Sequence, residues 1–489
     1  MKNLLELYGT VLDLQAALAL LEFDQQTAMP SGAETGRSAQ MAALSGVIHR
    51  EMTSGKLRRA LEKCEKALYP EDSFEKAVCR QLRRKLDRAA QIPGKLVKNL
   101  AMATASAHSA WLKARERADY SILAPELERI IALKQQYAAL FSGFECAYDA
   151  LLDEYEPGMS SAEVERIFAP LAAEQTQIVR EAAQIPAEPL PGGSYSKAAQ
   201  LAISSKVVRA MGYDFKHGRI DLTEHPFTTN IGLQDVRITT AVHRDLPVSC
   251  LLSTVHECGH ALYEQGIAPQ YHRTVLGDGV SYAFHESQSR LWENLVGRSR
   301  AFWEWLYPEY QKRFKQLASV PAEQFFRAVN RVQFSEIRTE ADEATYNLHI
   351  LVRFELEKEL FSGKLAPREL RDAWNGKMEK FLGITPRNDR YGVLQDIHWP
   401  LGDFGYFPTY ALGNLIASQI WEAAETLMPE LEQNIGAGNF KPLREFLREK
   451  VHRHGARYTR EQLLKQICGA ESISARPFLN YLRKKYTVA

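Results

Sequence analysis

Apolar residues recur at helical spacing through most of this 489-residue chain, and this spacing constrains the fold more than any other feature. Within residues 73–91, four apolar residues are spaced by four in an otherwise charged segment: Phe74, Val78, Leu82 and Leu86. Residues four apart lie on one side of an α-helix, so the pattern predicts an amphipathic helix. Similar patterns occur in four further stretches: 96–118, 124–153, 160–184 and 309–360. We therefore expect a mainly α-helical protein.

Two stretches depart from the helical pattern. Residues 187–196, AEPLPGGSYS, are rich in Pro, Gly and Ser. They predict a loop between an N-terminal helical lobe, residues 1–186, and a second helical region, residues 197–489. Residues 234–243, QDVRITTAVH, alternate apolar and polar side chains and are rich in β-branched residues, which predicts a short strand. The sequence has no repeat at a solenoid period, so a helical-repeat protein is disfavoured.

The charge balance and the N-terminus argue against two classes of partner. Lys and Arg number 61 against 60 Asp and Glu, the net charge is +1, and no long basic tract suggests nucleic-acid binding. Near the N-terminus, Glu6, Asp13 and Gln15 interrupt the apolar residues, which favours an amphipathic helix over a secretory signal. No stretch elsewhere approaches the roughly 18 uninterrupted apolar residues of a membrane span. We expect neither nucleic acid nor a membrane as partner.

The six cysteines are scattered and none forms a CxxC pair. In a chain of this length, such scatter is typical of reduced thiols rather than of a disulfide framework. We therefore expect a cytoplasmic protein.

The segment 249–266, SCLLSTVHECGHALYEQG, carries the chemistry. His256 and His260 are four residues apart, so on a helix their imidazoles can converge on one metal ion, and neutral imidazole suits zinc. Glu257 lies about 100° further round the helix, where its carboxylate can take a proton from an activated water. Cys258 lies about 200° from His256, which predicts a small buried residue rather than a ligand. Apolar neighbours on both sides predict that this helix is buried.

A catalytic zinc site needs a third protein ligand and one open position. The segment 282–298, YAFHESQSRLWENLVGR, is a second helical pattern with three candidates: His285, Glu286 and Glu293. Zinc peptidases with this kind of first helix commonly take a glutamate from a following helix. Glu286 lies 26 residues after His260, which leaves room for a loop and a second helix, but spacing alone cannot exclude Glu293.

The chain resembles the Taq-type thermostable carboxypeptidase family of zinc metallopeptidases. The resemblance rests on six ordered blocks between residues 225 and 399: His225-Pro226-Phe227, Asp235-Val236-Arg237-Ile238-Thr239, His256-Glu257-Cys258-Gly259-His260, His285-Glu286-Ser287-Gln288, Ile337-Arg338-Thr339-Glu340-Ala341-Asp342 and Gly392-Val393-Leu394-Gln395-Asp396-Ile397-His398-Trp399. Six blocks in order are far more specific than one motif.

The resemblance implies a single catalytic unit with an almost wholly helical, two-lobed fold, a deep active-site groove and a small β-sheet at its edge. It implies removal of single residues from free C-termini of peptides with broad specificity, and one Zn²⁺ per chain for which Co²⁺ can substitute. It assigns Glu286 as the third ligand and, from resemblance only, predicts a homodimer.

The remaining roles are each weighed against a structural alternative. Arg338, expected in mid-helix, is a candidate for binding the substrate carboxylate, because its guanidinium can form two parallel hydrogen bonds; the alternative is pairing with neighbouring acids. Arg237 lies on the predicted strand, which is a candidate for binding extended peptide as an added strand. The alternative is that Arg237 forms a structural ion pair with Asp235 or another acid. The resemblance implies that His398 and Tyr410 stabilise the oxyanion. The alternative is a structural role for both in an aromatic-rich loop that caps the core.

His225 is a further candidate, for contact with the substrate backbone, although its neighbours Pro226 and Phe227 favour a role in shaping a turn.

Two other functions compete with a carboxypeptidase. An endo-acting oligopeptidase could share the helical zinc scaffold, and cleavage of an amidated peptide would separate the two. A helical binding scaffold with a structural metal is disfavoured, because structural zinc sites are usually closed and rich in cysteine.

Overall fold

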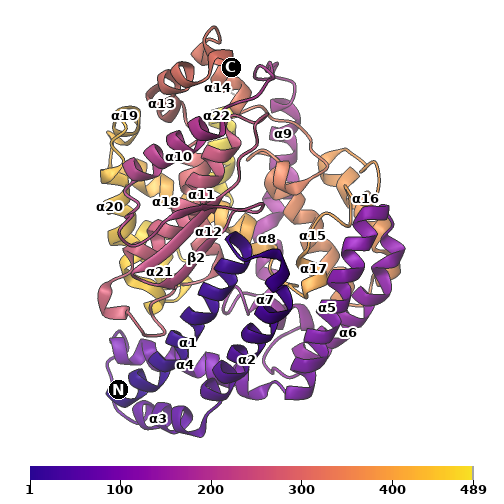
Figure 1. Ribbon diagram of the computed structural model, residues 1–489, viewed down its shortest axis with the longest axis vertical. Coiled ribbons are helices and arrows are strands. Elements are labelled where there is room, and N and C mark those ends of the chain that lie inside the picture. The colour runs from indigo at the N-terminus through magenta and orange to yellow at the C-terminus, as the bar shows by residue number, and fades with distance from the viewer. Residues whose placement is uncertain (487–489) are drawn as a thin grey trace. The chain divides into compact units, whose positions relative to one another are not determined.

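The computed structural model describes residues 1–486, and helices dominate it (Figure 1). The chain forms two compact units, each made of three segments. The first unit contains Met1–Ala90, Glu188–Val329 and Ala417–Ser472. The second contains Gln91–Ala187, Asn330–Ile416 and the segment that begins at Ile473. The predicted loop at 187–196 coincides with one segment boundary, and residues 1–90 belong to the same unit as residues 188–329, so these two units do not follow the predicted division into 1–186 and 197–489.

The helices of the first unit are α1 Lys2–Thr27, α2 Glu34–Met52, α3 Gly55–Glu65, α4 Phe74–Gln91, α10 Lys197–Met211, α11 Ser249–Gly266, α12 Tyr282–Arg290, α13 Arg300–Arg313, α14 Ala322–Val329, α19 Leu431–Gly436, α20 Lys441–Lys450 and α21 Arg460–Cys468. Those of the second are α5 Gly94–Arg117, α6 Ala124–Ala138, α7 Ala147–Leu152, α8 Ser161–Pro170, α9 Thr176–Ala182, α15 Tyr346–Phe361, α16 Leu370–Leu382, α17 His398–Leu401 and α22 Arg476–Tyr486. Helix α18, Pro408–Leu427, contributes residues to both. Two π-helical turns continue α8 and α12: Leu171–Gln175 and Leu291–Val296.

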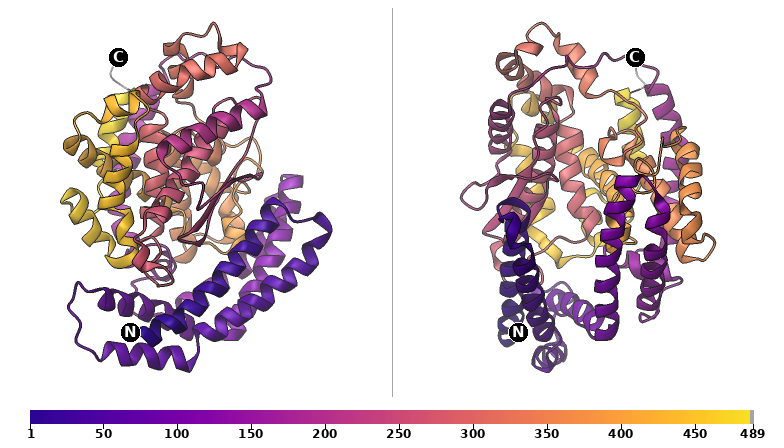
Figure 2. Two further views of the ribbon diagram at one scale, coloured as in Figure 1. Left: turned by 60° about the vertical axis from the view of Figure 1, so that its left-hand side comes forward. Right: turned by 45° about the vertical axis from the view of Figure 1, so that its right-hand side comes forward.

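The sheet has three strands: β1 Ile220–Leu222, β2 Thr228–Gly232 and β3 Asp235–Thr240. Their order is β1-β3-β2, with β1 parallel and β2 antiparallel to β3. The predicted strand at 234–243 is confirmed as β3, and the two short strands beside it were not predicted. Val236 and Ile238 on β3 are fully buried, and the sheet packs against α11 (Figure 2).

Most predicted helices are confirmed, but the stretch 309–360 is not continuous. Between α14 and α15, residues 330–345 form an irregular segment with only a 3-10 turn at Arg338–Glu340. The Asp342 carboxylate accepts hydrogen bonds from three backbone N–H groups here, those of Gln333, Ala344 and Thr345. Acidic side chains that take up backbone donors in this way compete with helix formation. The stretch 124–153 is likewise interrupted, between α6 and α7.

Helix α1 is the one described helix that is long and apolar enough to cross a membrane, because an 18-residue window within it has a mean hydropathy of 1.5. Membrane spans, signal sequences and helices of folded proteins share such length and composition. Here its buried residues include Leu4, Tyr8 and Val11, at amphipathic spacing, and it packs against α2 and β2. Figure 1 shows α1 and α2 side by side. The predicted amphipathic first helix is consistent with this packing.

A candidate metal centre

Helix α11 lies in the core of the first unit and holds the two predicted histidine ligands in fixed positions. It packs against α10, α12 and strand β3, and its apolar residues, including Leu251, Val255 and Leu262, are almost completely buried. Cys258 is also fully buried, as its place on the helix predicted. His256 and His260 are four residues apart, so their imidazoles lie on the same face of α11. Because α11 is packed on several sides, that face is held in a fixed position.

Helix α12 brings the carboxylate to that face. It begins after Ser281, whose hydroxyl accepts a hydrogen bond from the Phe284 N–H at 3.3 Å. A Cβ atom at Gly259 would lie only 2.6 Å from the Gln288 carbonyl oxygen and from Ser289 Cα. The glycine inside the HECGH motif therefore allows α11 and α12 to approach closely enough for Glu286 to reach the histidines.

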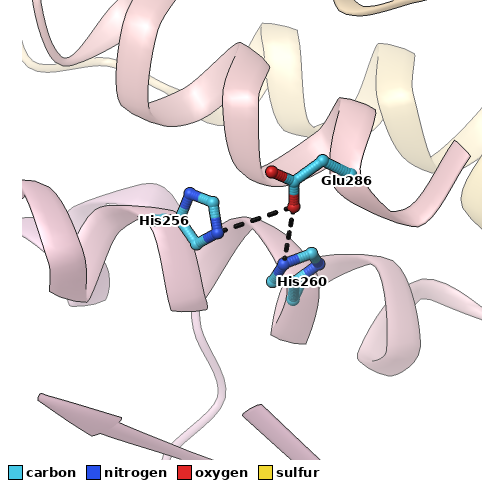
Figure 3. Close-up of side chains that lie close together, drawn as sticks. All are labelled: His256, His260 and Glu286. Atoms are coloured by element: carbon cyan, nitrogen blue, oxygen red, sulfur yellow. Dashed lines mark ion pairs between the residues drawn. The ribbon is translucent and has the colours of Figure 1, made fainter. Parts of the chain in front are cut away.

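The three side chains form a compact group (Figure 3). Glu286 Oε2 lies 3.6 Å from His256 Nε2 and 3.3 Å from His260 Nε2. One ligand atom from each residue lies within 4.8 Å of the other two. Ligands about 2.0–2.1 Å from one zinc ion at tetrahedral angles are roughly 3.4 Å apart, so both the spacing and the donor set fit zinc.

Glu286 is oriented by its neighbours and is ionised. Arg290 Nε donates to Glu286 Oε1 at 2.6 Å, and the Ser289 hydroxyl donates to Oε2 at 3.0 Å. Burial by itself would raise the pKa of Glu286, but Arg290 and the two histidines outweigh it and lower the pKa well below its ordinary value. The carboxylate is therefore in the form that binds a cation.

Glu293, the alternative third ligand, lies behind His256. Its Oε2 is 2.8 Å from His256 Nδ1, the ring nitrogen opposite the one that faces Glu286. Burial opposes ionisation of Glu293, but Arg290 and His256 lower its pKa to about 2. An ionised carboxylate in this position fixes the proton on Nδ1 and leaves the Nε2 lone pair for a metal.

His285, the third candidate, lies behind the other histidine. Its Nδ1 is 2.6 Å from His260 Nδ1, and its Nε2 is 2.6 Å from Glu264 Oε1. His285 therefore contacts a predicted ligand and is not part of the three-residue group itself.

Glu257, the predicted general base, is 6% exposed and is held by the sheet. The Thr228 hydroxyl on β2 lies 2.6 Å from Glu257 Oε2 and 2.9 Å from its carbonyl oxygen. Burial raises the pKa of Glu257, although His256 and the Thr228 hydrogen bond act in the opposite direction. Sequence reasoning missed Thr228; its only signal was the β-branched pair at 228–229, five residues before the start of the predicted strand.

Arg237 and His225 lie near the sheet. Strand β3 is the central strand and is paired on both sides, so it has no free edge to which an extended peptide could add. Arg237 instead forms two hydrogen bonds to Asp235, of 2.8 and 2.7 Å, and stacks over Phe23. His225 is exposed in the bend between β1 and β2.

Three predicted residues lie in the second unit, where they meet one another. Arg338 is 6% exposed and lies in the 3-10 turn, so the prediction of a mid-helix position is wrong. Its Nε and Nη2 donate to Asp396 Oδ1 at 3.0 and 2.8 Å, and its Nη1 donates to the Tyr346 hydroxyl at 2.7 Å. The guanidinium also lies 5.0 Å from the centre of the Tyr410 ring. Arg338 thus pairs with a distant aspartate rather than with the acids of its own segment.

His398 and Tyr410 are in contact, with 3.3 Å between His398 Nε2 and the Tyr410 hydroxyl. Burial lowers the pKa of His398 to about 4, and the nearby Arg338 and Arg353 act in the same direction although Asp396 opposes them. His398 is therefore neutral near pH 7, with one ring N–H to donate.

Comparison with known proteins identifies the family of the chain. The family model described as carboxypeptidase Taq (M32) metallopeptidase matches residues 3–486. Thermostable carboxypeptidase 1 of Thermus thermophilus is 42% identical, with 99% of this chain and 98% of the relative covered. Carboxypeptidase 1 of Bacillus subtilis is 34% identical over the same shares of the two chains.

Solved structures agree as well. The M32 carboxypeptidase from Deinococcus radiodurans has a TM-score of 0.96 and 40% identity, with 99% of this chain and 98% of that chain covered. Metallocarboxypeptidase 1 of Trypanosoma cruzi has a TM-score of 0.95 and 31% identity, with 100% and 99% covered. With a paired-histidine and glutamate group on α11 and α12, and a family match over nearly its whole length, the chain belongs to the carboxypeptidase Taq (M32) family of metallopeptidases.

Proposed function

We propose that this metallocarboxypeptidase uses one zinc ion per chain to remove single residues from free peptide C-termini with broad specificity. The observation that carries the proposal is the arrangement on α11 and α12. His256 and His260 of α11 converge with Glu286 of α12, and the buried Glu257 lies next to His256 on α11. Two imidazoles with one carboxylate are the donor set of many hydrolytic zinc sites, and Co²⁺ suits the same donors.

When bound, zinc would polarise the scissile carbonyl and acidify a water molecule. Glu257 then acts as general base: it takes the proton of the attacking water and passes it to the leaving amine. Burial favours this role, because a raised pKa makes the carboxylate a better proton acceptor. The Thr228 hydroxyl holds one oxygen of the Glu257 side chain, which leaves the other for water.

Donors for the substrate are proposed from the residues of the second unit. His398 and Tyr410 are assigned to the oxyanion that forms as the carbonyl is attacked; neutral imidazole and a phenol are both suitable donors. Arg338 is assigned to the terminal carboxylate of the substrate. To bind a carboxylate with Nη1, Arg338 has to exchange its hydrogen bond with the Tyr346 hydroxyl while it keeps Asp396.

Two further assignments concern residues near the sheet. His225 is proposed to contact the substrate backbone, and its exposure is compatible with that role. Arg237 is proposed as substrate-binding too, but its two hydrogen bonds to Asp235 favour the ion-pair alternative.

The place of action and the assembly are also proposals. The six cysteines lie within the part of the chain that the structure describes, and none of them forms a disulfide there, which supports the cytoplasm as compartment. A homodimer is proposed from the family resemblance alone. Peptides with a free C-terminus are the proposed partners; nucleic acid and membranes are not.

A timed digest of one synthetic peptide, followed by mass spectrometry, tests the function. We expect products that shorten one residue at a time from the C-terminal end. The same peptide with an amidated C-terminus should be cleaved far more slowly. Internal fragments, or equal rates on both peptides, would instead support the endo-acting alternative. Treatment with a chelator should stop the reaction, and added Zn²⁺ should restore it.

A further inference from the structure

The two histidine ligands are supported in different ways. His256 Nδ1 meets a carboxylate directly, that of Glu293, at 2.8 Å. His260 Nδ1 meets a second imidazole, His285, at 2.6 Å. A carboxylate comes only after that: His285 Nε2 lies 2.6 Å from Glu264 Oε1. Glu264 is 5% exposed, and its second oxygen accepts a hydrogen bond from the Asn230 amide on β2.

The geometry allows only one arrangement of protons when His260 binds a metal. His260 then uses the lone pair of Nε2, which faces Glu286, so its proton is on Nδ1. His285 Nδ1 must accept that proton in a hydrogen bond, and the single proton of a neutral His285 is therefore on Nε2. Nε2 donates to Glu264, whose carboxylate can only accept. Each short contact thus has one donor and one acceptor.

We propose that His285 and Glu264 are positioning residues that hold His260 in its metal-binding tautomer. They do so through a series of hydrogen bonds that runs from His260 to Asn230. The inference rests on the proposed metal site and extends it beyond the three ligands. Residues that orient ligand histidines typically change metal affinity by 10-fold to 100-fold when they are replaced. This series of hydrogen bonds ends on β2, the strand whose Thr228 holds Glu257, so one strand supports both a ligand and the proposed base.

Three leucine and asparagine variants test this proposal. Asn and Leu have nearly the same shape, but only Asn places a hydrogen-bond acceptor near the position of the histidine Nδ1. The first variant is His285→Leu, which removes both hydrogen bonds, and the second is His285→Asn, which keeps an acceptor for His260. The control is His452→Leu. His452 is 1% exposed, stacks on Tyr263 of α11 and contacts Gln288 of α12, so it packs against the same two helices without contacting a ligand.

The measurement is the zinc dissociation constant, obtained by competition with a chelator, together with the visible spectrum of the Co²⁺-loaded protein. We expect His285→Leu to weaken zinc binding at least 10-fold and to change the Co²⁺ spectrum. His285→Asn should recover most of the affinity, and His452→Leu should stay within about threefold of the wild type. Equal weakening by His285→Leu and His452→Leu, or no recovery in His285→Asn, would overturn the proposal.

Glu264→Gln is a second variant in case His285→Leu does not fold. It keeps the shape of the side chain and removes its charge, and it should weaken zinc binding several-fold. An unchanged zinc dissociation constant in Glu264→Gln would contradict the proposed positioning of His260 through Glu264. A wild-type protein that binds no zinc would instead refute the proposed function, so the two failures are distinguishable.

Discussion

Each unit of the molecule contains a buried group of charged side chains, and the two groups differ in how their charges are satisfied. In the second unit, Asp396 lies between Arg338 and Arg353, and its carboxylate accepts hydrogen bonds from both guanidinium groups. In the first, Glu293 and Arg290 hold the outer atoms of His256 and Glu286, while the inner atoms of both converge on one point. The carboxylate of Asp396 is thus already paired with cations of the protein, whereas lone pairs that converge on one point are arranged for a bound cation.

The largest expected effect comes from the proposed base. Glu257→Gln should bind zinc with the wild-type stoichiometry and lower kcat by roughly 10³-fold or more, because only proton transfer is removed. Peptide hydrolysis and metal analysis on the same sample provide the measurement. A variant that retains a tenth of the wild-type kcat would contradict the assignment.

Glu286→Gln and Asp396→Asn should separate the two charged groups. Glu286→Gln should lose most zinc affinity, because an amide is a much poorer ligand than a carboxylate. Asp396→Asn should leave zinc affinity unchanged but destabilise the fold by about 3–5 kcal/mol, because it leaves two buried guanidinium groups short of a counter-charge.

Denaturant titrations and zinc competition on both variants check this contrast. If Asp396→Asn weakened zinc binding as strongly as Glu286→Gln, the two groups would not be independent.

Glu357 in the second unit should make stability depend on pH. It is fully buried and accepts hydrogen bonds from Tyr148, Trp399 and the Gly405 N–H. Burial raises its pKa from 4.5 to about 7, against the effect of these donors. Between these values the folded state holds a proton that the unfolded state has lost, so the free energy of unfolding falls as pH rises, by roughly 3 kcal/mol in total.

Chemical denaturation of the wild type and of Glu357→Gln at pH 4.5 to 7.5 measures this effect. The variant should show a flatter profile over that range. Parallel profiles for the two proteins would mean that Glu357 is already ionised in the folded state at acidic pH.

The smallest expected effect is that of Arg237→Gln. If Arg237 mainly pairs with Asp235, the variant should lose at most about 1 kcal/mol of stability and keep its KM within a factor of about two. A large rise in KM with unchanged stability would favour the substrate-binding role. Asp235→Asn is the matched control, because it breaks the same ion pair from the other side.

The sequence predicted well what depends on local spacing. The fourfold apolar pattern located α4 and α5, and the His256–His260 spacing together with the family resemblance identified three side chains that converge. Prediction from the sequence failed where a side chain forms hydrogen bonds with a residue distant in the sequence, and where a side chain accepts hydrogen bonds from backbone N–H groups in place of a backbone carbonyl. Asp342 interrupts the predicted helix around Arg338, and Asp396 pairs with that arginine across 58 positions. The contacts of Thr228 with Glu257 and of His285 with Glu264 depend on packing that no periodicity encodes.

Gly259 has a consequence for how this enzyme can vary. Two helices are in contact there with no side chain between them, and the width of the metal site is set by that direct contact. A single methyl group at position 259 would act as a wedge, pushing Glu286 away from both imidazoles without touching any of the three. Metal selectivity could thus be retuned from a residue that never meets the ion.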